Sequence, residues 1–155
     1  MRDTDDVALW YALHRLIATY WADVDHQGGT RAHDFYVPEA LFAVGGNRFE
    51  GQEKIRLFYA RRRQRGSTST RHLVSNLRVS EEDLCHAHAL GLMSLYRADG
   101  RPPIRGTRPP AIIADFEAHC VLGEDRLWRF RSHVLQPVFI GSDLPISMSI
   151  DPEQL

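Results

Sequence analysis

The segment Thr70-Arg71-His72-Leu73-Val74-Ser75-Asn76-Leu77-Arg78-Val79 decides the fold prediction, because its side chains alternate with a period of two. Such alternation predicts a β-strand whose successive side chains point to opposite faces of a sheet. One face carries His72, Val74, Asn76 and Arg78, and the other carries Arg71, Leu73, Ser75, Leu77 and Val79. A strand that combines an apolar row with a row containing histidine and asparagine is typical of the wall of a polar-lined pocket.

The rest of the C-terminal half continues this two-residue period. It predicts a long strand over Leu84–Arg97 with a face of small residues, and then a hairpin of Ala111–Leu122 and Leu127–Val138 around the turn Gly123–Asp125. Between the long strand and the hairpin lies a loop over residues 100–110 that is rich in proline and arginine and cannot be regular structure. A loop of this length in a compact domain is often the rim of a functional site.

The N-terminal half has helical spacing instead. One apolar stripe predicts a long first helix that ends at Gly28-Gly29, with the stripe made of Val7, Leu9, Trp10, Leu13, Leu16, Ile17, Tyr20, Trp21 and Val24. A short helix through Ala32–Tyr36 and a small hairpin of Leu41–Val44 and Arg48–Glu50 follow, and Gly51 opens a third helix. Helices followed by a run of strands predict an α+β domain, in which a strongly curved antiparallel sheet wraps a pocket and the N-terminal helices cover one face.

Composition predicts a single globular domain over residues 1–140 with a C-terminal extension over 141–155. The chain has 155 residues, of which 43% are hydrophobic and 25% charged, and its formal net charge is −1. This balance argues against nucleic acid or an anionic membrane as partner. An acidic N-terminus and the absence of a long apolar run predict a cytoplasmic protein. Two cysteines without C-x-x-C spacing indicate reduced thiols.

Five segments, in their order and spacing, resemble the SnoaL-like family of the nuclear-transport-factor-two-like superfamily, which implies a cone-shaped, cystatin-like α+β fold. They are Tyr20–Asp25, Glu50–Phe58, Thr70–Asn76, Asp115-Phe116 and Trp128–Arg131. In catalytic members such as the scytalone dehydratases, bile-acid 7α-dehydratases and hexachlorocyclohexane dehydrochlorinases, an Asp at the end of the first helix pairs with a His on the first long strand. The resemblance places these roles on Asp25 and His72. Helical spacing alone leaves Asp23 open as the acidic partner, since Tyr20 shares a face with Asp23 and Trp21 with Asp25.

An aspartate that accepts a hydrogen bond from one imidazole nitrogen fixes the tautomer and leaves the other nitrogen free to take a proton. His72 is therefore the predicted general base and Asp25 its orienting partner, in an enzyme that needs no cofactor and no metal. The predicted reaction is a dehydration, isomerisation or cyclisation of a hydrophobic cyclic small molecule, such as a polyketide or steroid. The predicted substrate-binding residues are Tyr20, Trp21, Asn76, Asp115 and Arg131, of which Tyr20, Asn76 and Arg131 are candidate donors to a developing oxyanion.

Two other classes of function stay open. One is a non-catalytic assembly subunit that resembles the β subunit of ring-hydroxylating dioxygenases, and the other is a small-ligand-binding module. Apolar outward-facing strand residues predict a homodimer or a higher homo-oligomer. His86 and His88 have a spacing that could bind a metal, but no carboxylate motif lies near them in sequence, so a surface or interface role is expected. His119 and His133 have no predicted role.

Overall fold

The computed structural model describes residues 3–106 and 108–142. The predicted extension over 141–155 falls almost wholly outside the described residues. In the described part the elements are α1 (Asp3–Gln27), the 3₁₀ helix η1 (Ala32–Phe35), β1 (Tyr36–Val44), β2 (Asn47–Glu50), α2 (Gln52–Gln64), β3 (Thr68–Asp83), β4 (His86–Asp99), β5 (Ile112–Leu122) and β6 (Trp128–Ile140). No described helix combines the length and apolar character that a membrane span requires.

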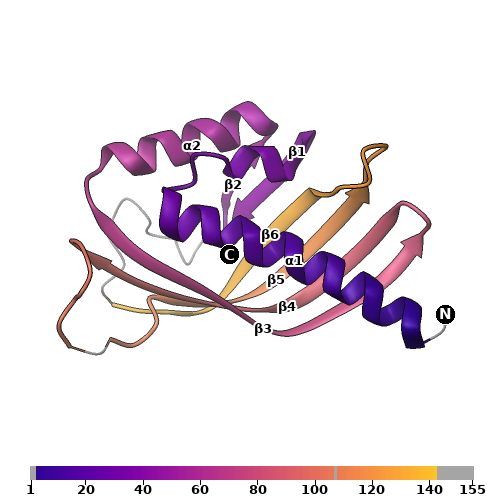
Figure 1. Cartoon of the computed structure of the whole chain (residues 1–155). Coiled ribbons are helices and arrows are strands. Elements are labelled where there is room, and N and C mark those ends of the chain that lie inside the picture. Colours follow the sequence, from indigo (N-terminus) through magenta and orange to yellow (C-terminus); the bar gives the residue numbers. More distant parts are fainter. Residues whose placement is uncertain (1–2, 107, 143–155) are drawn as a thin grey trace.

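The strands form one sheet in the order β2-β1-β6-β5-β4-β3, which leaves β2 and β3 as its edges. The sheet is curved, and α1 lies across its concave face while α2 packs beside β1 and η1 (Figure 1). This arrangement confirms the predicted α+β class. One pairing differs from the expected antiparallel pattern, because β1 and β6 run parallel. The meander of β3 to β6 reverses direction three times and brings β6 back beside β1 in the same direction as β1.

The core lies between α1 and the concave face of the sheet. Helix α1 contributes Leu13, Leu16, Ile17, Tyr20, Trp21 and Val24, all buried. Alanines at positions 87, 89, 114 and 118 face them from β4 and β5, and these short side chains let the helix approach the sheet closely. The first turns of the predicted stripe differ, since Val7 and Trp10 are 66% and 41% exposed. Trp10 donates its indole N–H to the carbonyl of Leu77 near the sheet edge.

A bulge interrupts β3 between Ser75 and Arg78, where Asn76 adopts a left-handed backbone with a φ of 52°. One extra residue reverses the alternation that follows it. Leu77 and Val79 consequently pack against the core, whereas Asn76 and Arg78 are exposed. The predicted assignment of faces holds for His72 and Val74 and is wrong beyond the bulge.

Candidate functional site

Asp25 lies in the last turn of α1, and its carboxylate forms hydrogen bonds with two residues of β3. Its Oδ1 lies 2.6 Å from Nδ1 of His72 and accepts a hydrogen bond from the Thr70 hydroxyl at 2.8 Å. Its Oδ2 accepts the backbone N–H of His72, also at 2.8 Å. Both side chains are buried, with exposures of 8% for His72 and 5% for Asp25. The contact between Asp25 and His72 that was predicted is therefore present.

The surroundings of the pair favour the deprotonated form of both partners. Burial disfavours the charged form of Asp25, but the hydrogen bonds from His72 and Thr70 outweigh it and lower the pKa of the Asp25 carboxyl. Burial is the main cause of the lowered pKa of His72. The Asp25 carboxylate raises this pKa and offsets only part of the effect of burial, whereas the positive charge of Arg62 lowers it further. At neutral pH the pair is accordingly a carboxylate hydrogen-bonded to a neutral imidazole whose Nδ1 carries the proton, so Nε2 has a free lone pair.

Trp21 and Arg62 fix the surroundings of this pair. The Trp21 ring stacks on the His72 ring with centroids 3.9 Å apart and an angle of 8° between the planes. Trp21 and Asp25 lie one turn apart on α1, so the same helix face supplies the stacking ring and the carboxylate. Arg62 of α2 donates to the Thr70 hydroxyl at 3.2 Å, which links α2 to the residue that holds Asp25.

His72 and Trp21 border a small cavity of about 50 Å³ between α1, α2 and the sheet. Most of its wall is apolar and aromatic, and its polar members are His72, Thr70, Tyr59, Arg62 and Arg97. A wider surface groove of about 400 Å³ lies beside the pair, and Val24 and Arg62 border both spaces. Asp25 lines the groove, as do Arg63, Arg71 and Arg101. The Asp25–His72 pair therefore lies between a largely apolar interior cavity and a basic groove at the surface.

A chain of buried hydroxyl groups runs from β6 to the cavity wall. The Tyr36 hydroxyl contacts Nδ1 of His133 and the Tyr20 hydroxyl, each at 3.0 Å, and the Tyr20 hydroxyl in turn hydrogen-bonds that of Tyr59. Burial is the main cause that raises the pKa of Tyr59 well above its ordinary value, so this phenol stays protonated. His133 is 1% exposed, and burial lowers its pKa to about 3. Its Nε2 is buried and has no hydrogen-bond partner among the residues that the structure describes.

The structure brings only some of the predicted substrate-binding residues to the cavity. Trp21 borders the cavity as expected, whereas Tyr20 is fully buried behind the wall and reaches the cavity only through Tyr59. Asp23 does not contact His72, because its carboxylate accepts the backbone N–H of Arg31 in the turn after α1. The carboxylate that contacts His72 is therefore that of Asp25.

Three of the predicted substrate-binding residues, Asn76, Asp115 and Arg131, lie outside the cavity. All are exposed. Asn76 sits in the β3 bulge. Asp115 is on the outer face of β5, between the buried Ala114 and Phe116. Arg131 falls in a second bulge, where Cys120 pairs with Phe130 and His119 with Ser132, so Phe130 and His133 both point inward and Arg131 does not. None of these three residues borders the cavity, and their role in substrate binding stays a prediction.

Sequence reasoning overlooked Tyr59, Arg62 and Thr70. Thr70 could have been found, because it lies two residues before His72 and therefore on the same strand face. Tyr59 and Arg62 are ordinary members of an amphipathic helix, and no local signal separates them from core and surface residues. Among the described residues, the one group of His and acidic side chains with metal-ligand spacing lies elsewhere, on the outer face of β4 and β5.

A cone-shaped α+β fold with a buried Asp–His pair at the end of its first helix defines the class of this protein. The sequence model of the SnoaL-like domain matches residues 6–134, and the chain belongs to that family. No curated protein sequence gives a significant match.

Solved structures with similar folds include three that cover most of this chain. An NTF2-like protein with a cystatin-like fold from Novosphingobium aromaticivorans is 15% identical with a TM-score of 0.69, over 90% of this chain and 86% of the other. A candidate scytalone dehydratase from the same organism is 16% identical with a TM-score of 0.74, over 90% and 89%. A protein from Catenulispora acidiphila in complex with S-DNPA is 16% identical with a TM-score of 0.72, over 84% and 94%. At these identities the likeness establishes the fold.

Proposed function

We propose that this protein is a cofactor-independent acid–base enzyme in which His72 is the general base and Asp25 orients it. The observation that carries the proposal is the 2.6 Å contact between Asp25 Oδ1 and His72 Nδ1 beside a largely apolar cavity. A neutral imidazole held in one tautomer can accept a proton from carbon at neutral pH, and positioned acid–base catalysis is typically worth about 10² to 10⁴ in rate. Membership in the SnoaL-like family supports an enzyme of this class.

The proposed reaction is the elimination of water from a β-hydroxy carbonyl compound. Nε2 of His72 removes the proton from the carbon α to the carbonyl, and the electron pair of that C–H bond forms an enolate. The enolate collapses to a carbon–carbon double bond as the β C–O bond breaks, and the departing hydroxide takes the proton from the imidazolium. Water and the unsaturated carbonyl compound are the only products, and His72 returns to its neutral state. Stopping at the enolate and reprotonating another carbon gives isomerisation.

Tyr59 is the proposed donor to the enolate oxygen, in place of Asn76 and Arg131. Tyr59 borders the cavity. The tyrosine relay is the chain of buried hydroxyl groups behind it, in which His133 Nδ1–H donates to Tyr36, Tyr36 donates to Tyr20 and Tyr20 donates to Tyr59. In that orientation the Tyr59 proton is free to point away from the relay. A preorganised donor of this kind is typically worth about 10² to 10³ in rate when charge develops on oxygen.

The substrate that fits this wall is a hydrophobic cyclic molecule of the polyketide or steroid kind. A cavity of about 50 Å³ does not hold it as it stands, since ligand pockets usually span roughly 300 to 1,000 Å³. Arg62 borders both the cavity and the adjoining groove of about 400 Å³. We propose that substrate enters from this groove and displaces the Arg62 side chain from Thr70. This displacement would join the cavity and the groove into one space.

We further propose that the protein is a homodimer. Val138, Phe139 and Ile140 at the end of β6 are 49%, 66% and 39% exposed, an apolar run that a second copy would cover. Sedimentation equilibrium tests this proposal, and a single species with the mass of one chain would contradict it.

The small cavity favours one alternative, a non-catalytic subunit. A chain with a structural role has no need of a substrate-sized space, and here the cavity lined by Trp21, Phe42 and Phe58 measures only about 50 Å³. The buried Asp–His pair is harder to explain in such a subunit, because burying an ionisable pair costs free energy that a purely structural contact between α1 and β3 does not require.

Proton exchange in D₂O separates the two functions without knowledge of the natural substrate. The enzyme should catalyse the uptake of deuterium at the α carbon of cyclic ketones, followed by NMR, and should convert matching β-hydroxy ketones to enones, followed by ultraviolet absorbance. The His72→Ala variant should lose both activities while retaining its circular dichroism spectrum. Exchange that persists in His72→Ala, or no exchange with any ketone of a broad panel, would overturn the enzyme proposal.

A further inference from the structure

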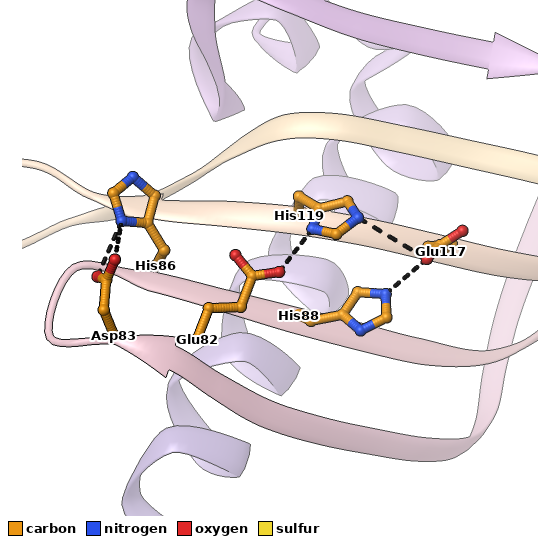
Figure 2. Close-up of polar contacts among 6 residues, drawn as sticks. All are labelled: Glu82, Asp83, His86, His88, Glu117 and His119. Atoms are coloured by element: carbon orange, nitrogen blue, oxygen red, sulfur yellow. Dashed lines mark hydrogen bonds and ion pairs between the residues drawn. The ribbon is translucent and has the colours of Figure 1, made fainter.

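Three strands bring a cluster of histidines and carboxylates together on the outer face of the sheet (Figure 2). His88 on β4 and His119 on β5 are direct cross-strand partners, and their rings stack with centroids 4.5 Å apart. Glu117 lies two residues before His119 on the same face of β5. Their ligand atoms all lie within 4.8 Å of one another. The carboxylate that the sequence spacing of His86 and His88 lacked is therefore supplied across the strands.

Both imidazoles converge on a single carboxylate oxygen. Oε1 of Glu117 is 2.7 Å from Nε2 of His88 and 3.7 Å from Nε2 of His119. Ligands of a tetrahedral zinc ion at about 2.0 to 2.1 Å are separated from one another by about 3.3 Å. The two observed separations bracket this value. The three ligand atoms lie within 4.8 Å of one another, so the two imidazoles must move toward each other by up to about 1.5 Å for all three atoms to surround one ion.

A second carboxylate orients one of the ligands. Nδ1 of His119 lies 2.9 Å from Oε1 of Glu82 on β3, so in the neutral ring Nδ1–H donates to Glu82 and Nε2 carries a lone pair. That lone pair faces the Glu117 oxygen, which is also an acceptor. Without an ion, the same Glu117 oxygen accepts the Nε2–H of His88 at 2.7 Å, and a bound cation would take the place of that proton. A carboxylate behind the remote nitrogen is the usual way in which proteins orient a metal-binding histidine.

We propose that His88, His119 and Glu117 form a binding site for Zn²⁺ or a similar first-row divalent cation, with Glu82 as the positioning residue. Imidazole and carboxylate ligands suit zinc, and two histidines with one glutamate leave a fourth position for water or another ligand. The surroundings favour a cation, since Glu82, Glu117 and Asp83 lie at this end of the sheet (Figure 2). His86 pairs with Asp83 at 2.8 Å and stands outside the three-ligand group. The bound ion would link β4 directly to β5.

Isothermal titration calorimetry of the chelator-treated full chain with Zn²⁺ tests the site. We expect one ion per chain, and we expect His88→Gln and His119→Gln each to abolish that binding. Glu82→Gln should weaken the binding by about 10- to 100-fold, as other losses of an orienting partner do. His14→Gln is the matched control, because His14 is an exposed histidine on α1 that lies outside the cluster.

The exposed thiol of Cys85 is a competing zinc ligand, so the titration is repeated with Cys85→Ser. Unchanged stoichiometry and affinity in Cys85→Ser and His14→Gln, together with loss in the two cluster variants, supports the proposal. Zinc binding that survives both His88→Gln and His119→Gln, or that disappears in Cys85→Ser, would overturn it. Circular dichroism of each variant shows that the fold is retained, and Co²⁺ absorption in the visible range reports tetrahedral coordination directly.

Discussion

The carboxylate of Asp25 makes two contacts with His72, one with the imidazole Nδ1 at 2.6 Å and one with the backbone N–H at 2.8 Å. The side-chain contact fixes the tautomer, and the backbone contact fixes the position of the strand against the end of α1. This double contact ties the packing of the first helix to the protonation of the candidate base. Changes at Asp25 should therefore affect both catalysis and stability.

Asp25→Asn should lower kcat by about 10³ to 10⁴ on any substrate found, because an amide no longer fixes the imidazole tautomer or stabilises its charged form. The shape of the side chain and its contact with the backbone of His72 are retained, so the cooperative unfolding transition should remain. Asp23→Asn is the matched control on the same helix and should change kcat by less than about threefold. Equal losses in both variants would remove the special role of Asp25.

The acid limb of the kcat/KM profile should have its midpoint below pH 6.5. The active form of His72 is neutral, and burial lowers its pKa, so the neutral form persists to lower pH than in a solvated histidine. Activity should then fall as the pH decreases through the lowered pKa. A profile measured from pH 4 to 8 checks this, and a midpoint above 7 would mean that the Asp25 charge dominates over burial.

Tyr59→Phe should reduce kcat by about 10² and leave the fold intact, since it removes one hydroxyl that could stabilise an enolate oxygen. Tyr36→Phe serves as the comparison, because the Tyr36 hydroxyl is two hydrogen bonds further from the cavity. We expect a smaller loss of kcat there. If Tyr36→Phe lowers kcat as much as Tyr59→Phe does, the hydrogen-bonded tyrosines maintain the fold and do not act in the reaction.

His133 should make the protein less stable as the pH falls from 7 to 5. Its pKa is about 3 in the folded state and about 6.5 when unfolded, so the unfolded chain binds the extra proton over this range. The contribution of neutral His133 to the free energy of unfolding is fully present above pH 6.5, and about 2 kcal/mol of it should be lost by pH 5. Urea unfolding of wild type and His133→Phe at both pH values measures the difference. His14→Gln should retain the wild-type pH dependence.

Gly91→Ala should destabilise the fold by about 1 to 3 kcal/mol through overpacking. A Cβ at this position would lie 2.5 Å from Cε1 of Phe116 and 3.0 Å from the carbonyl oxygen of Ser75 at the β3 bulge. Ser94→Ala, on the outer face of the same strand, is a suitable control with little expected change. If the thermal midpoint of Gly91→Ala shifts no more than that of the control, the β3 bulge accommodates the added methyl group without a measurable loss of stability.

The sequence by itself determined the class of fold, because hydrophobic periodicity depends on which residues must be buried. The change from helical spacing to two-residue alternation near Thr70 corresponds to the boundary between α2 and β3. The contact of Asp25 with His72 was also expected, through the likeness of their two segments to a known family. The catalytic roles of the two residues stay predictions, and the reaction and substrate are proposals.

The tertiary structure alone decided which strand residues face the cavity. Alternation assigns faces correctly only while the pairing is regular, and the bulges at Asn76 and Arg131 each add one residue and reverse the rule. The tyrosine relay and the His88–His119–Glu117 cluster were likewise invisible in sequence, since their members come from separate elements. Cross-strand register is set by packing over the whole sheet, and local spacing carries no record of it.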